Sequence, residues 1–157
     1  MKLVSFDIHT PVGTFTRIGA HREHCIIDLN MAYARRLADQ GEPQPRRLAD
    51  AQLPSTMSEF LAGGTSAMEA ARHALNHAVA LGTSATGPAG ETMAYDPGSV
   101  SLRAPLPTPS SLRDFIAFEA HIAATSKRRG QPIPPEWYKA PVYYKGNHRT
   151  IIGPDHR

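Results

Sequence analysis

The chain has 157 residues, of which 41% are hydrophobic and 20% charged, and its formal net charge is +3. This composition is typical of a soluble globular protein with one domain, or with one small domain and part of another. No apolar run approaches the roughly 18 residues of a membrane span, and the single cysteine, Cys25, excludes an internal disulfide. Because the first residues also lack the apolar core of a secretory signal, the sequence predicts a cytoplasmic protein without a membrane partner.

The first thirty residues predict a β meander. Three segments rich in β-branched and aromatic residues, KLVSFDI, GTFTRIGA and CIIDLN, are separated by the turn-prone sequences HTPVG and AHREH. We therefore expect strands over residues 2–8, 13–20 and 25–30.

From Met31 the pattern becomes helical. Helices that each end at a glycine are expected over residues 31–40, 55–62 and 65–81. The last of them opens with Ser66 and Glu69 in the spacing of a capping box.

The organisation changes near residue 104. Residues 83–99 are rich in Gly, Pro, Ser and Thr and are typical of a connector, and residues 100–106 predict a short strand. Prolines at 105, 107 and 109 cannot lie inside a helix or a central strand. We predict an α+β fold with a β-meander and helical N-terminal domain over 1–104 and a second domain over 105–157.

Residues 110–129 predict a helix, with serines able to cap its start and cations in its last turn. Asp114 and His121 would be about 10 Å apart along its axis, too far to share a metal ion but able to flank one. We expect both to point into one cavity near the aromatic segment around Tyr144. Steps of four, three and four return to one side of a helix, so one stripe would consist of Asp114, Phe118, His121 and Thr125.

Several blocks between residues 105 and 155 are distinctive, namely PLPTPSSLRDFIAFEAH, RRG, PEWYKAPVYYKGN and IIGPD. Their order and spacing resemble the fumarylacetoacetate hydrolase family. The opening KLVSF, GTFTRIGA and IIDLN is also similar to the small N-terminal domain that precedes the catalytic domain in many members.

The resemblance implies that residues 105–157 begin a β-roll catalytic domain, truncated here, of a protein that is a homodimer when complete. Members bind Mg²⁺ or Ca²⁺ and cleave a carbon–carbon bond in 2,4-diketo acids such as fumarylacetoacetate or acylpyruvates, a reaction type of aromatic catabolism. Position by position, Asp114 matches a metal-binding aspartate, His121 the histidine that activates water, and Tyr144 an aromatic residue that contacts the substrate. Arg128 or the neighbouring Arg129 would meet a substrate carboxylate.

The implied chemistry suits these residue types. A cation chelated by two substrate oxygens acts as a Lewis acid for the departing carbanion. His121 can take a proton from water and later return it to carbon. From residue 110 onward eight Lys and Arg residues stand against four acidic ones, and such cations can anchor a small anionic 2-oxo or diketo acid.

Part of the family's site is missing from these residues. The family has two further metal-binding glutamates one residue apart, followed by an aspartate and a lysine, and no E-x-E occurs in this sequence. One carboxylate cannot hold a hard cation that takes roughly six or more oxygens. The sequence therefore indicates either an N-terminal fragment of a carbon–carbon hydrolase or an inactive truncated product, such as a subunit-assembly domain.

Other patterns carry less information. His73 and His77 share a helix face without a third ligand, so we interpret them as surface or structural residues. The HREHC segment, residues 21–25, has one cysteine, too few for a structural zinc site. SKRRG and YYKGNHR interleave cations with aromatic residues, as single-strand binders do, but the small net charge favours a protein without a nucleic-acid partner.

Overall fold

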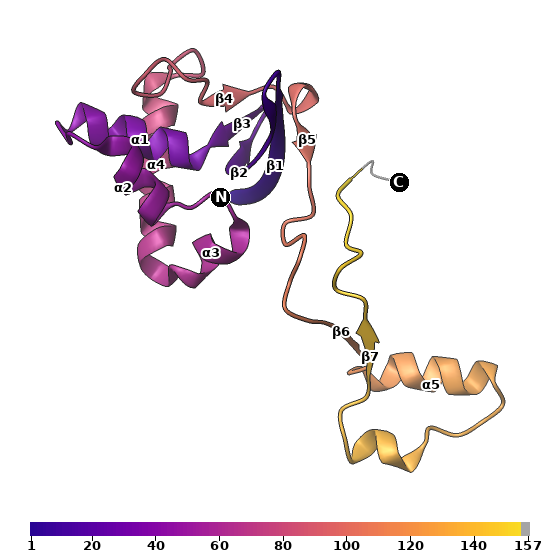
Figure 1. Cartoon of the computed structure of the whole chain (residues 1–157). Helices are drawn as coiled ribbons and strands as arrows, with labels where there is room; N and C mark the ends of the chain where they lie inside the picture. Colours follow the sequence, from indigo (N-terminus) through magenta and orange to yellow (C-terminus); the bar gives the residue numbers. More distant parts are fainter. Residues whose placement is uncertain (155–157) are drawn as a thin grey trace. The chain divides into compact units, whose positions relative to one another are not determined.

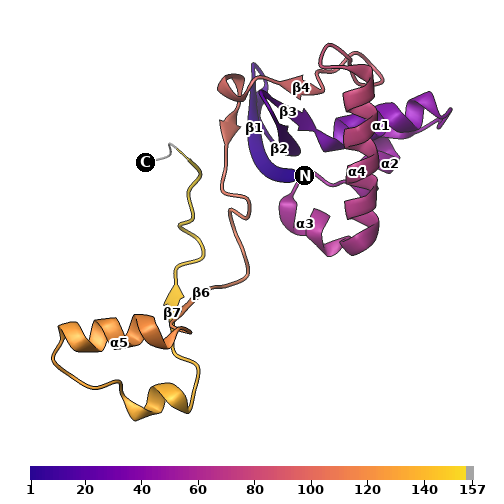
Figure 2. The same cartoon turned by 180° about the vertical axis from the view of Figure 1, so that it is seen from behind.

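The chain divides into two compact units in a computed structural model that describes residues 1–154 (Figure 1, and from behind in Figure 2). The first unit comprises Met1–Pro107 and the described residues from Ile152 onward, and the second comprises Thr108–Ile151. Strands and helices both occur, which confirms the α+β class. The division into domains at residue 104 stays a prediction. The last residues of the predicted second domain, 155–157, lie outside the described part, and they include Asp155 of the IIGPD block.

The first unit is built on an antiparallel sheet with the strand order β4-β3-β2-β1-β5. Its long strands confirm the expected meander: β1 (Lys2–Thr10), β2 (Gly13–Arg22) and β3 (Cys25–Asp28). The short strands β4 (Ala94–Tyr95) and β5 (Ser101–Leu102) each extend one edge of this meander.

The helices of the first unit lie together on one side of the sheet in both views (Figure 1, Figure 2). They are α1 (Leu29–Asp39), α2 (Pro45–Gln52), α3 (Met57–Ala62) and α4 (Gly64–Leu81). The helices α1, α3 and α4 match predicted ones, whereas α2 has no counterpart among the predictions. Its eight residues are too few for a clear apolar period, and Pro45 at its first turn is the main local feature that favours a helix there.

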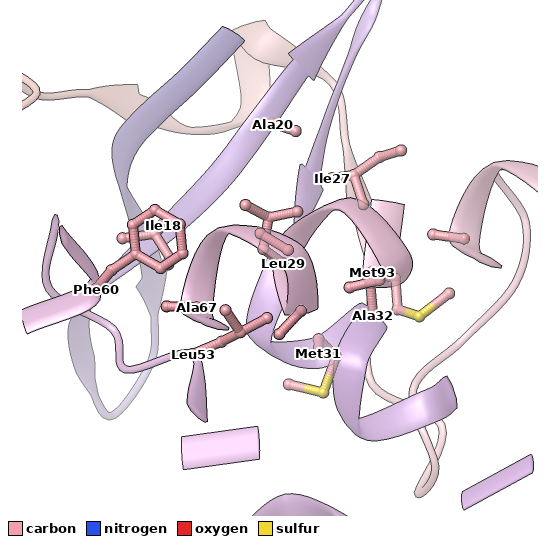
Figure 3. Packing of buried hydrophobic residues seen from close by; sticks show 14 of the residues in the cluster. Ile18, Ala20, Ile27, Leu29, Met31, Ala32, Leu53, Phe60, Ala67 and Met93 are labelled. Atoms are coloured by element: carbon pink, nitrogen blue, oxygen red, sulfur yellow. The ribbon is translucent and has the colours of Figure 1, made fainter. Parts of the chain in front are cut away.

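The hydrophobic core lies between the sheet and its helices (Figure 3). Ile18 of β2 and Ile27 of β3 pack there with Leu29 at the start of α1, and each is almost fully buried. Small side chains allow α4 to come close to its neighbours, because its buried residues are Ala67, Ala70, Ala71, Ala74 and Ala78.

Two aromatic rings from non-adjacent strands meet on the other face of the sheet. The rings of Phe6 on β1 and Tyr95 on β4 have centroids 5.6 Å apart, although three strand spacings would separate their backbones by about 14 Å in a flat sheet. Gly19 of β2 permits a close approach here, since a Cβ at this position would lie 2.8 Å from Ile26 and 2.9 Å from Phe6.

A buried polar network fixes the start of α1. The guanidinium of Arg17 donates hydrogen bonds to Asp28 (2.7 Å), Asn30 (2.9 Å) and Ser55 (3.1 Å). Asp28 also caps α1 by accepting a hydrogen bond from the backbone N–H of Met31. Because Asp28 and Asn30 are buried, Arg17 supplies a partner that their burial requires.

The second unit contains β6 (Leu112–Phe115), α5 (Glu119–Arg128), the short 3-10 helix η2 (Pro135–Tyr138) and β7 (Tyr143–Gly146). The prediction of one helix over 110–129 is therefore wrong in its first half. The backbone of β6 pairs with β7, and the N–H of Ile116 donates to the carbonyl of Val142. Phe115 packs on Tyr143 across the strands with ring centroids 5.0 Å apart, a pairing that favours a strand over a helix.

The second unit buries few side chains. Among Thr108–Ile151, all of which the structure describes, Ser126 is the one buried residue. Many of its large apolar side chains are exposed, namely Leu112, Phe115, Phe118, Tyr138, Val142, Tyr143 and Tyr144. Such a surface is large for so small a unit and is typical of regions that another element or chain covers.

Candidate functional site

Asp114 and Tyr144, predicted as a metal ligand and a substrate contact, are directly opposite each other on β6 and β7. Opposed residues of an antiparallel pair project from the same face, with Cβ atoms about 4.5–5.5 Å apart. Both side chains are exposed. The structure thus brings these two residues together through strand pairing.

The other face of the same strands carries a different set of side chains. Arg113 is opposite Lys145, and Phe115 is opposite Tyr143. The Arg113 guanidinium lies 5.4 Å from the centroid of the Tyr143 ring. Because neighbouring residues of a strand alternate between faces, Arg113 and Lys145 point away from the face of Asp114. These two cations therefore do not serve as an anion anchor beside it.

His121 and Arg128 both belong to α5, His121 in its first turn and Arg128 at its last residue. Seven residues apart, they lie on nearly the same side of the helix and about 10 Å from each other along its axis. Both are exposed. The single-helix stripe expected from Asp114 to Thr125 does not exist, because Asp114 is on a strand and Phe118 precedes the helix.

The short helix η2 fixes the start of α5 to the end of β6. The indole N–H of Trp137 donates to the backbone carbonyl of Ile116 (2.9 Å), and the Tyr138 hydroxyl donates to the Glu119 carboxylate (3.1 Å). Desolvation and the neighbouring Glu119 carboxylate together raise the pKa of Tyr138 above its ordinary value. These two contacts hold the strand-to-helix turn on which the placement of His121 depends.

A shallow pocket of about 300 Å³ lies beside this turn. Ile116, Trp137 and Val142 are among its lining residues, and the predicted site residues are not: Asp114, His121, Arg128 and Tyr144. This pocket is therefore not the shared cavity that the sequence led us to expect.

The described residues do not make up a complete site for Mg²⁺ or Ca²⁺. Residues 1–154 contain no group of three or more His, Cys, Asp or Glu side chains placed to hold a metal ion. Asp114 alone offers one carboxylate, whereas such a cation takes roughly six or more oxygen ligands. The HREHC segment likewise forms no such group within the part of the chain that the structure describes.

Comparisons of the sequence with protein-family models and with curated proteins find no match. In the described part of the chain, no helix combines the length and the apolar character that crossing a membrane requires.

Proposed function

We propose that this chain carries part of the active site of a hydrolase of the fumarylacetoacetate hydrolase type, which cleaves a carbon–carbon bond in a 2,4-diketo acid. The observation that supports the proposal is the direct opposition of Asp114 and Tyr144 on one face of the β6–β7 pair. The sequence blocks that carry the resemblance supply these two residues from separate segments, and strand pairing makes them neighbours. In this proposal the second unit begins a β-roll domain of a cytoplasmic protein.

His121 is the general base in this proposal. Its imidazole takes a proton from a water molecule, the resulting hydroxide attacks a carbonyl carbon of the diketo acid, and the proton then passes to the departing carbanion. Arg128 meets a carboxylate of the substrate, since a guanidinium can donate two parallel hydrogen bonds to such a group. Tyr144 contacts the substrate beside Asp114.

A divalent cation, Mg²⁺ or Ca²⁺, belongs to this type of site and stabilises negative charge on substrate oxygens when it is bound. Asp114 is one ligand in the proposal. The other carboxylates would come from outside the described residues, because within residues 1–154 Asp114 belongs to no cluster of metal-binding side chains.

Cleavage of acetylpyruvate tests the proposal. The protein purified from its native source, with Mg²⁺ or Ca²⁺ present, should release pyruvate, which a coupled lactate dehydrogenase assay detects. His121→Ala and Asp114→Asn should each lower kcat/KM by about 100-fold or more, because they remove the base and a metal ligand.

His148→Ala is the matched control, since His148 belongs to the same unit but has no role in the proposal. Its kcat/KM should stay close to that of the unchanged protein. If no acylpyruvate of a panel yields pyruvate with either cation, the hydrolase proposal is wrong.

A second candidate function is subunit assembly, in which this chain helps form a homodimer. The exposed aromatic side chains of the second unit favour it. Light scattering should give a dimer mass, and Phe115→Asp should shift it to a monomer. Phe15→Asp is the control, because Phe15 and Phe115 are both 50% exposed but Phe15 belongs to the first unit. A monomer mass for the unchanged protein would exclude this candidate.

A further inference from the structure

The first unit contains a pocket of about 530 Å³ that is independent of the proposed hydrolase site. Its lining residues come from the β2–β3 turn, from β4 and from the C-terminal end of α4. Its volume falls within the range of about 300–1,000 Å³ that is usual for small-molecule sites. Every residue that lines it belongs to the first unit.

The inner wall of the pocket is apolar. It consists of residues from α4, β3 and β4 and of the residue before β4, namely Ile27, Ala78, Val79, Met93 and Ala94. Ala78 presents only a methyl group, so α4 leaves space here that a longer side chain would fill. An occupant therefore needs a compact hydrophobic body.

Among the described residues, some charged side chains at the rim of the pocket have a partner of opposite charge, and one does not. Arg22 and Glu23 lie next to each other, with 3.9 Å between guanidinium and carboxylate, and largely offset one another. The Asp96 carboxylate accepts a hydrogen bond from the backbone N–H of Gly98 (2.7 Å), and no cationic side chain of the described residues forms an ion pair with it. His24 also lines the pocket and opposes a cation only when it is protonated.

The end of α4 adds further negative character. Gly82 and Thr83, which follow the helix, line the pocket. The last turn of α4 contains no basic residue, so no side chain of that turn offsets the negative end of the helix dipole. Asp96 and the helix end together make this rim favourable for a positive charge.

We infer that this pocket binds a small molecule with a hydrophobic, ring-sized body and a protonated amine, the class of arylalkylamines. The body lies against the apolar wall, and the ammonium group lies between Asp96 and the C-terminal end of α4.

Alkylation of Cys25 measures occupancy at this place, because Cys25 lines the pocket and is the only cysteine of the chain. The rate of reaction with N-ethylmaleimide is followed at one fixed, near-neutral pH, where the reagent is selective for thiols over amines, with 2-phenylethylamine, 2-phenylethanol or 3-phenylpropanoate. The amine at about ten times its Kd should slow alkylation about tenfold, since only the empty pocket reacts. The alcohol should bind less tightly than the amine, and the carboxylate least tightly.

Two variants assign the effect to the pocket. Val79→Trp places a large ring in the pocket from a position that is 38% exposed, and it should abolish protection by the amine. Leu61→Trp is its control, because Leu61 is 46% exposed on α3 and does not line this pocket. Asp96→Asn should raise the Kd of the amine at least about threefold and leave that of the alcohol unchanged. Circular dichroism verifies that each variant is folded.

Each other outcome overturns the inference. If none of the three probes slows alkylation, the pocket does not bind such molecules. If 3-phenylpropanoate protects as well as the amine, the ligand class is wrong. If protection by the amine persists in Val79→Trp, the binding site lies elsewhere.

Discussion

Asp114 on β6 is directly opposite Tyr144 on the antiparallel neighbour β7, although the whole of α5 and η2 lies between them in the sequence. This register decides which side chains share a face. It puts the acid and the tyrosine together and puts Arg113 and Lys145 on the opposite face. Tyr144 is therefore the cross-strand neighbour of Asp114, and it lies beside any ligand that Asp114 binds.

The register predicts a specific cross-link. In a Cys25→Ser background, the double variant Asp114→Cys with Tyr144→Cys should form a disulfide readily under mild oxidation. Directly opposed residues have Cβ atoms about 4.5–5.5 Å apart, close to the spacing that a disulfide needs. Free-thiol counting and mass spectrometry measure the product.

The matched control pairs Asp114→Cys with Tyr143→Cys, which places the second thiol on the opposite face of the sheet. This pair should oxidise much more slowly. Equal rates for the two double variants would contradict the register.

Arg17 is predicted to contribute strongly to the stability of the first unit. Arg17→Leu should lower the free energy of unfolding by about 3–5 kcal/mol, because it leaves Asp28 buried without its cationic partner. Urea unfolding followed by far-UV circular dichroism measures the loss. Arg22→Leu should cost less than about 1 kcal/mol, since its pair with Glu23 is exposed and 3.9 Å long. Similar losses for both variants would contradict this prediction.

The ion pair between Arg103 and Asp7 predicts a pH dependence of stability. Burial raises the pKa of Asp7, but hydrogen bonds from Thr16 and Arg103 outweigh burial and bring the pKa below its ordinary value of 3.8. A lowered pKa means that the folded protein binds this proton less readily than the unfolded chain. The stabilisation is therefore present above pH 3.8 and is lost as the pH falls below it.

Arg103→Leu should accordingly lower the free energy of unfolding by about 1–2 kcal/mol at neutral pH, since solvent partly screens its guanidinium. The difference from the unchanged protein should become smaller as the pH approaches about 3, because protonation of Asp7 removes the charge that Arg103 compensates. Urea unfolding at both pH values measures it. A difference that stays constant with pH would show that Arg103 acts through packing alone.

Most of the first unit could be predicted from the sequence because its signals are local. Segments rich in β-branched and aromatic residues, separated by turn-prone sequences, indicate β1, β2 and β3, and glycines such as Gly41 and Gly82 follow the helices where expected. The helix α2 was not predictable in this way, since it is short and Ala49 is the one buried residue in its described span.

The second unit could not be predicted in the same way because its structure depends on distant pairing. The spacing of Leu112, Phe115 and Ile116 fits the period of a helix. Residues 112–115 form a strand because they pair with β7, which is far along the chain. The candidate site shares this origin. Residue types pointed to Asp114 and Tyr144 separately, but their opposition follows from the register. The pocket beside Cys25 is likewise made by segments that are distant in sequence.

The two units should unfold separately. The second has one buried residue among its described span Thr108–Ile151, whereas the first has an extended apolar core. Because burial of apolar surface sets much of the stability, the second unit should unfold at lower urea. The only tryptophan, Trp137, lies in the second unit, and the helices α1 to α4 give the first unit most of the far-UV signal. Tryptophan fluorescence should therefore change at lower urea than circular dichroism does.

A variant sharpens this last prediction. Trp137→Phe removes the hydrogen bond from the indole N–H to the carbonyl of Ile116, so it should weaken the second unit alone. The main far-UV transition, which reports the first unit, should keep its urea midpoint. Hydrogen exchange of the β6 and β7 amides, measured by mass spectrometry, should become faster in the variant, while exchange in β1 to β3 stays unchanged. Coincident fluorescence and far-UV transitions in the unchanged protein would contradict the prediction and mean that the two units unfold as one. Two units with cores of unequal size would share the urea midpoint and the slope of their transitions only by chance.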